Sequence, residues 1–297
     1  MSRPSLFYRT QWTTRFQNRV KRSRPATNIL YTIATNEIYK VNEFSDKIVA
    51  VIPCYNEEAR LDHQQISLLL DEPRMNLLFV DDGSTDQTGK VIKNLAQRYP
   101  NRIEFLPLKI NVGKAEAVRV GMLQAIKSGA PFVGYVDADF ATPARDVLRI
   151  STELIEQTNI RVILGCRVQC LGSEIHRSIS RHYLGRIFAT WSSIILRMGV
   201  YDTQCGAKFF AASDLLRESL MQPFLSRWAF DVELIARLKY GVDGQPGYGK
   251  EKFLELPLNY WEDKSGSKLK MADKIKVVIE MMRITAYIWQ LRKKMVE

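Results

Sequence analysis

The regular alternation of strand and helix patterns is the feature that most restricts how this chain can fold. Four short apolar runs are typical of buried strands, and they lie at 48–52, 77–80, 103–108 and 132–136. Three helical patterns separate them, at 57–70, 85–98 and 114–127. Alternating strands and helices build βαβ units. The sequence therefore predicts an α/β fold with a mostly parallel central sheet flanked by helices.

The second half of the chain continues with mixed elements. A helix starts at Pro143, and further strands are predicted at 162–164, 207–210 and 253–258. Further helices are predicted at 177–198, 230–240 and 271–294. In the last of these, apolar residues recur at spacings of three and four, at Ile275, Ile279, Met282, Ala286 and Trp289. Basic residues lie largely off this stripe and close the helix, which predicts a basic amphipathic segment.

Polar clusters follow the predicted strands, at 53–57, 81–86, 111–114 and 137–139. Each cluster alone has an ordinary explanation, because such residues also form turns and helix caps. Ligands of parallel α/β sheets bind at the carboxyl ends of the strands. Four clusters at successive strand ends should therefore converge on one crevice, which we expect to be the functional site.

The cluster at 137–139 suggests a metal site. Asp137 and Asp139 are two residues apart after a strand, so both carboxylates can project to the same side. Carboxylates bind Mg²⁺ or Mn²⁺, which usually arrives with substrate phosphates. Asp82 could accept a hydrogen bond from a base or ribose, and Lys114 could place a cation near the phosphates. The loops lack the glycine patterns of P-loops and dinucleotide-binding folds.

The net charge of +11 points to an anionic partner. The first 36 residues carry seven basic residues and no acidic one, and the segment from Lys264 onward has a net charge of +6. The charge therefore belongs to the two flanks, which favours an anionic membrane surface over nucleic acid. The aromatic-containing N-terminal arm could equally be a transit-like or a poorly ordered segment.

The sequence contains no apolar run of the roughly 20 residues that a membrane-spanning helix needs. Its four cysteines form no CxxC pair and no zinc-ligand spacing, which predicts reduced thiols in a cytosolic-type compartment. We therefore expect a cytoplasmic protein that lies peripherally on the cytoplasmic face of a membrane.

The strand-end motifs resemble those of family 2, GT-A-type inverting glycosyltransferases. The matching stretches are IPCYNEE at 52–58, VDDGSTDQT at 80–88, NVGKAEAVRVGM at 111–122 and YVDADFATP at 135–143. They continue with GCR at 165–167, DTQCGAKFF at 202–210, RWAFDVEL at 227–234 and WEDKSGSKL at 261–269. These later blocks resemble the branch of dolichyl-phosphate β-glucosyltransferases and related polyprenyl-phosphate hexosyltransferases.

The resemblance implies roles for matching positions. The donor-binding residues would be Pro53, Tyr55, Asn56, Glu57, Asp82, Lys114, Asp137 and Asp139, with Asp137 and Asp139 holding Mg²⁺ or Mn²⁺. The acceptor side would comprise Arg167, Arg181, Gln204, Arg227, Trp228 and Glu233. The catalytic residues would be Asp139, Asp231, Arg167, Arg181 and Lys208. Three segments follow: a basic arm at 1–46, a Rossmann-like GT-A domain at 47–269, and the basic amphipathic helix at 270–297.

The activity implied is transfer of a hexose, most simply glucose from UDP-glucose, to a polyprenyl or dolichyl phosphate with inversion. A phosphate acceptor is already anionic, so arginines would position it without a strong base. A soluble or polysaccharide hydroxyl acceptor remains the alternative, and it requires a base, for which Asp231 and Glu233 are the candidates. Both carboxylates could instead be solvated residues of a helix turn. Nucleic-acid binding is the remote alternative, because carboxylates at the strand ends would repel phosphodiesters.

Overall fold

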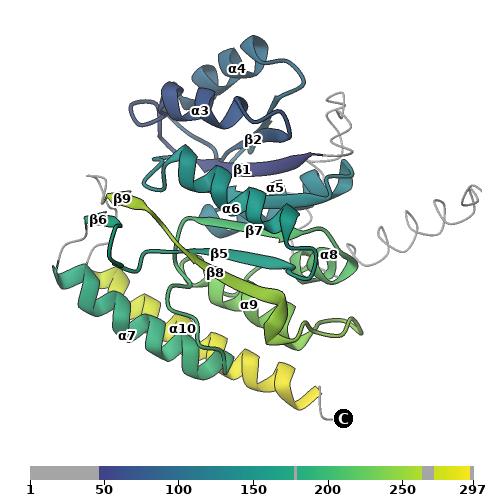
Figure 1. Ribbon diagram of the computed structural model, residues 1–297, viewed down its shortest axis with the longest axis vertical. Coiled ribbons are helices and arrows are strands. Elements are labelled where there is room, and N and C mark those ends of the chain that lie inside the picture. Colours follow the sequence, from purple (N-terminus) through teal and green to yellow (C-terminus); the bar gives the residue numbers. More distant parts are fainter. Residues whose placement is uncertain (1–46, 177–178, 263–270, 295–297) are drawn as a thin grey trace, which may run out of the picture. The chain divides into compact units, whose positions relative to one another are not determined.

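The computed structural model describes residues 47–176, 179–262 and 271–294, so the predicted arm at 1–46 lies outside the described residues. Its centre is a seven-stranded sheet with the strand order β3-β2-β1-β4-β7-β5-β8 (Figure 1). The strands are β1 (Ile48–Cys54), β2 (Met75–Asp81), β3 (Ile103–Pro107), β4 (Phe132–Val136), β5 (Val162–Cys166), β7 (Ala207–Ala211) and β8 (Phe253–Pro257).

The sheet is parallel except at β7, which pairs antiparallel with both β4 and β5. The prediction of a mostly parallel sheet is therefore confirmed. Because β1 lies between β2 and β4, the carboxyl ends of these three strands are neighbours. The loops that follow them, which carry most of the predicted site, start at one edge of the sheet.

Helices cover both faces of the sheet. One face packs against α3 (His63–Leu70), α4 (Thr88–Arg98) and α6 (Ala144–Glu156). The other packs against α5 (Lys114–Lys127), α8 (Asp214–Met221) and α9 (Phe230–Tyr240). Side chains along β1 alternate between the two cores, with Val49 and Val51 facing one and Ala50 and Ile52 the other. This period of two explains why the strand is apolar throughout.

Several local predictions differ from the structure. The helix expected at 57–70 begins only at His63, because the Asp62 side chain caps it by accepting the N–H groups of Gln64 and Gln65. Helix α8 was not predicted. Neither was the second, two-stranded sheet of β6 (Glu174–His176) and β9 (Tyr260–Glu262).

Helices α7 (Ile179–Leu196) and α10 (Met271–Lys294) lie side by side and both pack on α9 (Figure 1). The core-facing residues of α10 are Met281, Ile284, Ile288 and Leu291. The stripe that the sequence picked out is a different one, since Met282 and Trp289 are 61% and 56% exposed. Helix α10 is therefore apolar toward the core and also partly apolar toward solvent. Within the described ranges, no helix combines the length and apolar character needed to cross a bilayer.

Candidate active site

The loops after β1 and β2 are joined by hydrogen bonds. The backbone N–H of Asn56 donates to Ser84 Oγ (3.0 Å), and Asn56 Oδ1 accepts the N–H of Thr85 (2.9 Å). Asn56 has a φ of 53°, a conformation that asparagine tolerates better than most residues. Pro53 is the penultimate residue of strand β1, and Tyr55 is the first residue after the strand. The predicted donor loop is thus a fixed structure rather than a loose connection.

Glu57 lies in the same loop after β1. Its backbone N–H donates to Thr88 Oγ1 (2.8 Å) at the start of α4, and its buried carboxylate pairs with Arg60. The hydrogen bond to Glu57 raises the pKa of the Arg60 guanidinium despite partial burial, and the charges of Asp139 and Asp137 act in the same direction. Arg60 therefore brings a positive charge near the two aspartates, a contribution that the sequence analysis missed.

Asp82, in the loop after β2, holds the loop after β3 in shape. Its two carboxylate oxygens accept the backbone N–H groups of Val112 (2.7 Å) and Gly113 (2.8 Å). Arg227 donates from the other side to the carbonyl of Val112 (3.2 Å). Gly113 has a φ of 95°, which a side chain would oppose. Burial raises the pKa of Asp82, although these two N–H groups and the charge of Arg227 counteract it. The contact of Asp82 with a base or ribose stays a prediction.

Asp137, Asp139 and Lys114 meet where β4 ends and α5 begins. Lys114 Nζ lies 2.5 Å from Asp137 Oδ1. The backbone N–H of Asp137 donates to the carbonyl of Gly206 (2.9 Å). A Cβ atom at Gly206 would lie only 2.2 Å from Asp137 Oδ2, so glycine is required for this carboxylate to keep its place. The structure therefore joins two separate motifs of the sequence, the one at 137–139 and the one at 202–210.

The negative charges of Asp137 and Asp139 are stabilised by nearby positive charge. Burial and then the negative charge of Asp137 raise the pKa of Asp139. Burial lowers the pKa of Lys114, but the charges of Asp137 and other carboxylates outweigh it, so the net shift is upward. Lys114 therefore remains a cation between acidic groups. Two neighbouring carboxylates raise each other's pKa, and a further cation beside them would stabilise the form in which both are ionised.

Asp231 lies at the centre of a second cluster. Its Oδ1 atom is 2.7 Å from Lys208 Nζ and also accepts a hydrogen bond from the Tyr135 hydroxyl. Its Oδ2 atom accepts from Gln204 Nε2 (3.2 Å). Lys208, Tyr135 and Asp231 are all buried. Three donors on β4, β7 and the preceding loop thus hold this carboxylate at the N-terminus of α9.

Arg167 follows β5 and forms a fork with Asp202. The Nε and Nη2 atoms of Arg167 lie 2.6 and 2.9 Å from the two oxygens of Asp202. The guanidinium carbon is 5.2 Å from the centroid of the Trp261 ring. The predicted acceptor-side arginine is therefore held on two sides by residues that the sequence analysis gave no role.

The contacts described above do not include three other predicted site residues, Glu233, Trp228 and Arg181. Glu233 is fully buried, and its carboxylate pairs with Arg237 (2.5 Å) and accepts the N–H of Leu225 (2.8 Å), so it is not brought to the crevice. Trp228 is 42% exposed just before α9. Arg181 belongs to α7, but its side chain lies outside the described residues.

Comparisons with known proteins decide the family. Residues 49–216 match the model of glycosyl transferase family 2. This chain belongs to that family. A dolichyl-phosphate beta-glucosyltransferase of Trichomonas vaginalis is 32% identical over 263 residues, which cover 82% of this chain and 76% of the relative. The human dolichyl-phosphate beta-glucosyltransferase is 32% identical over 244 residues, covering 75% of this chain and 69% of the relative.

Solved structures support the fold of this family 2 glycosyltransferase. A glucosyl-3-phosphoglycerate synthase of Mycobacterium tuberculosis, solved with Mn²⁺ and UDP, aligns with a TM-score of 0.57 at 18% identity, covering 87% of this chain and 86% of the other. A mannosyltransferase of Pyrobaculum calidifontis, solved with GDP-mannose and Mn²⁺, has a TM-score of 0.53 at 15% identity, covering 88% and 70%. The GT-A fold predicted from the motifs is thereby confirmed.

The residues of this glycosyltransferase fit a divalent metal that arrives with its substrate. In the described part of the chain, no three carboxylate, thiol or imidazole side chains converge as a ready-made cage. Asp137 Oδ1 is buried, and its close neighbour is the Lys114 ammonium, 2.5 Å away. Two carboxylates with diphosphate oxygens as further ligands are a typical Mg²⁺ or Mn²⁺ arrangement. We therefore regard Asp137 and Asp139 as a fitting donor pair.

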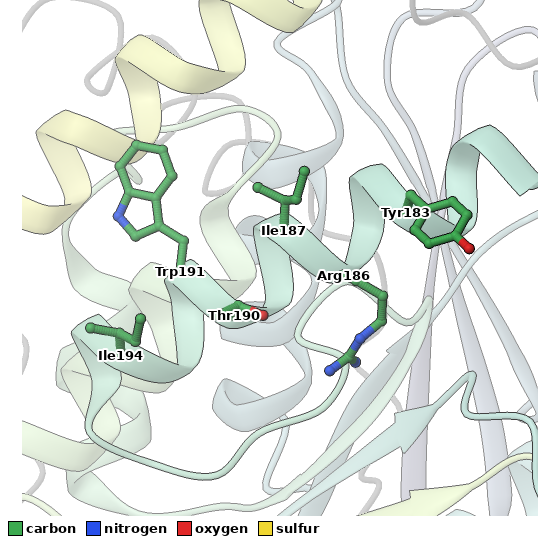
Figure 2. Close-up of a pocket in the computed structure, with 6 residues that line it drawn as sticks. All are labelled: Tyr183, Arg186, Ile187, Thr190, Trp191 and Ile194. Carbon is green, nitrogen blue, oxygen red and sulfur yellow. The ribbon is translucent and has the colours of Figure 1, made fainter.

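A shallow apolar groove of about 480 Å³ lies along α7. Figure 2 shows its six lining side chains, which project from successive turns of this helix: Tyr183, Arg186, Ile187, Thr190, Trp191 and Ile194. Ile187 and Ile194 are 66% and 68% exposed, which is unusual for large aliphatic side chains. The groove gives α7 an exposed apolar surface.

Some of the missed residues had a signal in the sequence. Tyr135 lies on β4 two residues before Asp137, which directly follows this strand, so the alternation of side chains predicts that both point to the same side. Asp202 and Gly206 lie inside the motif at 202–210, but nothing in the sequence says which partner each one meets. Their partners, Arg167 and Asp137, are 35 and 69 residues away in the chain.

Proposed function

We propose that this glycosyltransferase moves glucose from UDP-glucose to a polyprenyl phosphate such as dolichyl phosphate, with inversion at the anomeric carbon. The observation that carries this proposal is the state of Asp231. A general base needs a free lone pair near the proton that it removes. The Asp231 carboxylate already accepts hydrogen bonds from Tyr135 and Gln204 and is paired with the Lys208 ammonium. With three donors already on it, this carboxylate has little acceptor capacity left for the proton of a hydroxyl acceptor.

The second candidate base, Glu233, argues in the same direction. It is fully buried and paired with Arg237 inside the protein. A phosphate acceptor removes the need for either carboxylate to act as a base, because its oxygen is anionic near neutral pH. The curated relatives named above are dolichyl-phosphate beta-glucosyltransferases, which supports the same acceptor class and a glucosyl donor.

On the donor side, each group has a distinct task in the proposal. Asp82 and Arg227 hold the loop at 111–114 in shape, and Asn56 fixes the loop after β1. Asp137 and Asp139 would hold Mg²⁺ or Mn²⁺, which neutralises charge on a departing nucleoside diphosphate. Lys114 adds a fixed cation beside them. Preorganised positive charge of this kind stabilises the leaving group as its negative charge develops.

On the acceptor side, Arg167 is the residue that would bind the phosphate, with Arg181 as its proposed partner. Planar guanidinium groups match phosphate oxygens in a two-point geometry. Burial lowers the pKa of the Arg167 guanidinium, but the Asp202 carboxylate outweighs it and raises the pKa, and the charge of Asp137 acts in the same direction as Asp202. In the proposal, the acceptor arginine and the metal-binding pair face one crevice. Gln204, Lys208 and Trp228 complete the proposed sugar and acceptor side.

We further propose that the enzyme works on the cytoplasmic face of an anionic membrane. The exposed apolar residues of the two neighbouring helices are here called the α7–α10 surface: Tyr183, Ile187, Ile194, Val278, Ile279, Met282 and Trp289. Exposed basic residues of the same helices and the turn after α7 include Arg197, Lys276, Arg283 and Lys293. Apolar side chains together with basic ones are typical of helices that lie in a membrane interface.

The acceptor and donor can be tested together. Radiolabelled UDP- and GDP-sugars are each incubated with a short polyprenyl phosphate, or with soluble sugars that offer only hydroxyl groups, in Mn²⁺ buffer. We expect butanol-extractable label from UDP-glucose with the polyprenyl phosphate. Label that moves only to hydroxyl acceptors would support the alternative acceptor class, and label from a GDP-sugar alone would reject the proposed donor.

The membrane part needs substitutions rather than truncation, because α10 also supplies core residues. Ile187→Gln with Met282→Gln removes exposed apolar groups, so the fold should be unaffected. We expect reduced cosedimentation with vesicles that contain anionic lipid. Ile110→Gln, at a 56% exposed site on the loop after β3, is the matched control. Equal cosedimentation of the double variant and the wild type would reject the α7–α10 surface as a membrane contact.

A further inference from the structure

The fork between Asp202 and Arg167 constrains the guanidinium in a specific way. Both side chains are nearly buried, with exposures of 10% and 13%, and the backbone N–H of Arg167 also donates to Asp202 Oδ2 (3.1 Å). Asp202 occupies the edge formed by Nε and Nη2. A guanidinium has five N–H donors in a planar fork, so the Nη1 side remains suited to a second anion.

Asp202 is itself held firmly. Glu255, on β8, accepts the backbone N–H groups of Tyr201 (2.8 Å) and Asp202 (2.6 Å). Asp202 Oδ1 accepts the N–H of Gln204 (3.0 Å). From α7, Arg186 donates to the carbonyl of Tyr201 (3.3 Å) and stacks on its ring at 3.7 Å from the centroid. The short segment 201–204 is therefore tied to the sheet on one side and to α7 on the other.

The pair is also fixed in its charge state. Burial alone would raise the pKa of Asp202, but the adjacent Arg167 guanidinium lowers it well below the ordinary range. Asp202 is thus an anion across the physiological pH range and does not exchange protons with the acceptor. Its effect on Arg167 is geometric: it fixes the plane of the guanidinium against the Trp261 ring.

We propose that Asp202 is a positioning residue of the transfer step, which orients Arg167 for the acceptor phosphate and acts on the reaction only through that arginine. This inference rests on the proposed function, because it assumes that the acceptor is a phosphate. A pair with a purely structural role would stabilise the fold but would have no selective effect on one substrate. The difference between these roles can be measured.

The test is steady-state kinetics of Asp202→Asn with a short polyprenyl phosphate and UDP-glucose. We expect the acceptor KM to rise at least tenfold and the donor KM to stay within twofold, because the uncharged amide leaves Arg167 free to rotate. Asp214→Asn is the matched control, since Asp214 pairs with Arg217 on the exposed surface of α8. This control should match the wild type in both KM values.

A second variant protects the test against misfolding. Glu255→Gln weakens the hold on the backbone of Asp202 and keeps the size of the side chain, so the acceptor KM should rise at least threefold. Thermal melting checks that each variant is folded. Unchanged acceptor KM values in the folded variants, or equal rises in both KM values, would overturn the positioning role. A wild type that glucosylates only hydroxyl acceptors would instead reject the proposed function, and this outcome is visible before any variant is made.

Discussion

The ammonium of Lys114 and the carboxylate of Asp137 form an ion pair in which Nζ and Oδ1 are 2.5 Å apart. The pair joins the first residue of α5 to the residue that follows β4. The positive end of the α5 helix dipole therefore lies at the same point as a lysine and an aspartate. Cation and carboxylate are fixed together where a diphosphate and its metal would be received.

Removing the lysine should affect the donor. We expect Lys114→Met to lower kcat/KM for UDP-glucose by about 100-fold, because a fixed charge next to the leaving group is lost. Lys127→Met, at the exposed C-terminal end of the same helix, is the control and should leave kcat/KM unchanged. The value of kcat/KM is measured from initial rates at varied UDP-glucose concentration and a saturating concentration of the acceptor. Equal values for the two variants would remove Lys114 from the donor site.

Gly206 should tolerate no side chain. Gly206→Ala places a Cβ atom 2.2 Å from Asp137 Oδ2, so the carboxylate must move. A misplacement of this kind can reduce transfer by about 100-fold. Gly199→Ala is the matched control, since nothing lies within 4 Å of its Cβ position. Transfer rates and melting curves of both variants provide the check, and full activity of Gly206→Ala would contradict the assigned place of Asp137.

The metal pair predicts a selective loss of activity. Asp139→Ala should abolish transfer and leave the melting temperature close to that of the wild type, because the carboxylate makes few contacts with the fold. Asp71→Asn, an exposed aspartate at the end of α3, serves as the control. Titration with Mn²⁺ after chelation measures the requirement. If Asp139→Ala retained activity in Mn²⁺ buffer, the assignment of Asp139 as a metal ligand would be rejected.

Glu233 should prove to be a stabilising residue and not a base. Its burial raises its pKa, but the charge of Arg237 opposes that shift. Glu233→Gln leaves the Arg237 guanidinium buried without its charged partner, so the free energy of unfolding should fall by about 3 kcal/mol. Glu156→Gln, at the exposed end of α6, should have little effect. The measurement is urea unfolding, combined with kcat per folded enzyme.

A fall in kcat of Glu233→Gln by 100-fold or more, in enzyme shown to be folded, would contradict this prediction. It would also reopen the hydroxyl-acceptor alternative, in which a carboxylate near α9 removes a proton.

The cysteines should differ sharply in reactivity. Cys170 is exposed, whereas Cys54, Cys166 and Cys205 are buried. Burial raises the pKa of the Cys205 thiol to about 11, so its reactive thiolate is scarce at pH 8. A thiol-reactive chromophore should therefore label one thiol rapidly in the native protein and all four after denaturation. Cys170→Ser should remove the rapid phase, and a rapid phase that persists would contradict the burial of the other three.

The seven strands of the central sheet, most of the helices and the edge of the sheet that carries the candidate site could be predicted from the sequence. These features depend on neighbours in the chain: an apolar run such as 48–52 forms a buried strand, and polar residues after it form the loop. Asp137 and Asp139 were predictable as a pair for the same reason. The start of α3 was missed, because the capping side chain of Asp62 outweighed the helical pattern of 57–61.

The pairing of residues that are distant in the sequence follows only from how the elements pack. Asp231 meets Tyr135 across 96 residues of sequence, and Asp202 meets Arg167 across 35. Packing also decides that Glu233 is internal and that Met282 and Trp289 face outward. No periodicity encodes these facts, since they follow from the order of strands in the sheet and from which side of α9 each helix covers. Local patterns set the elements, but only their packing sets the charge, burial and partners of each catalytic candidate.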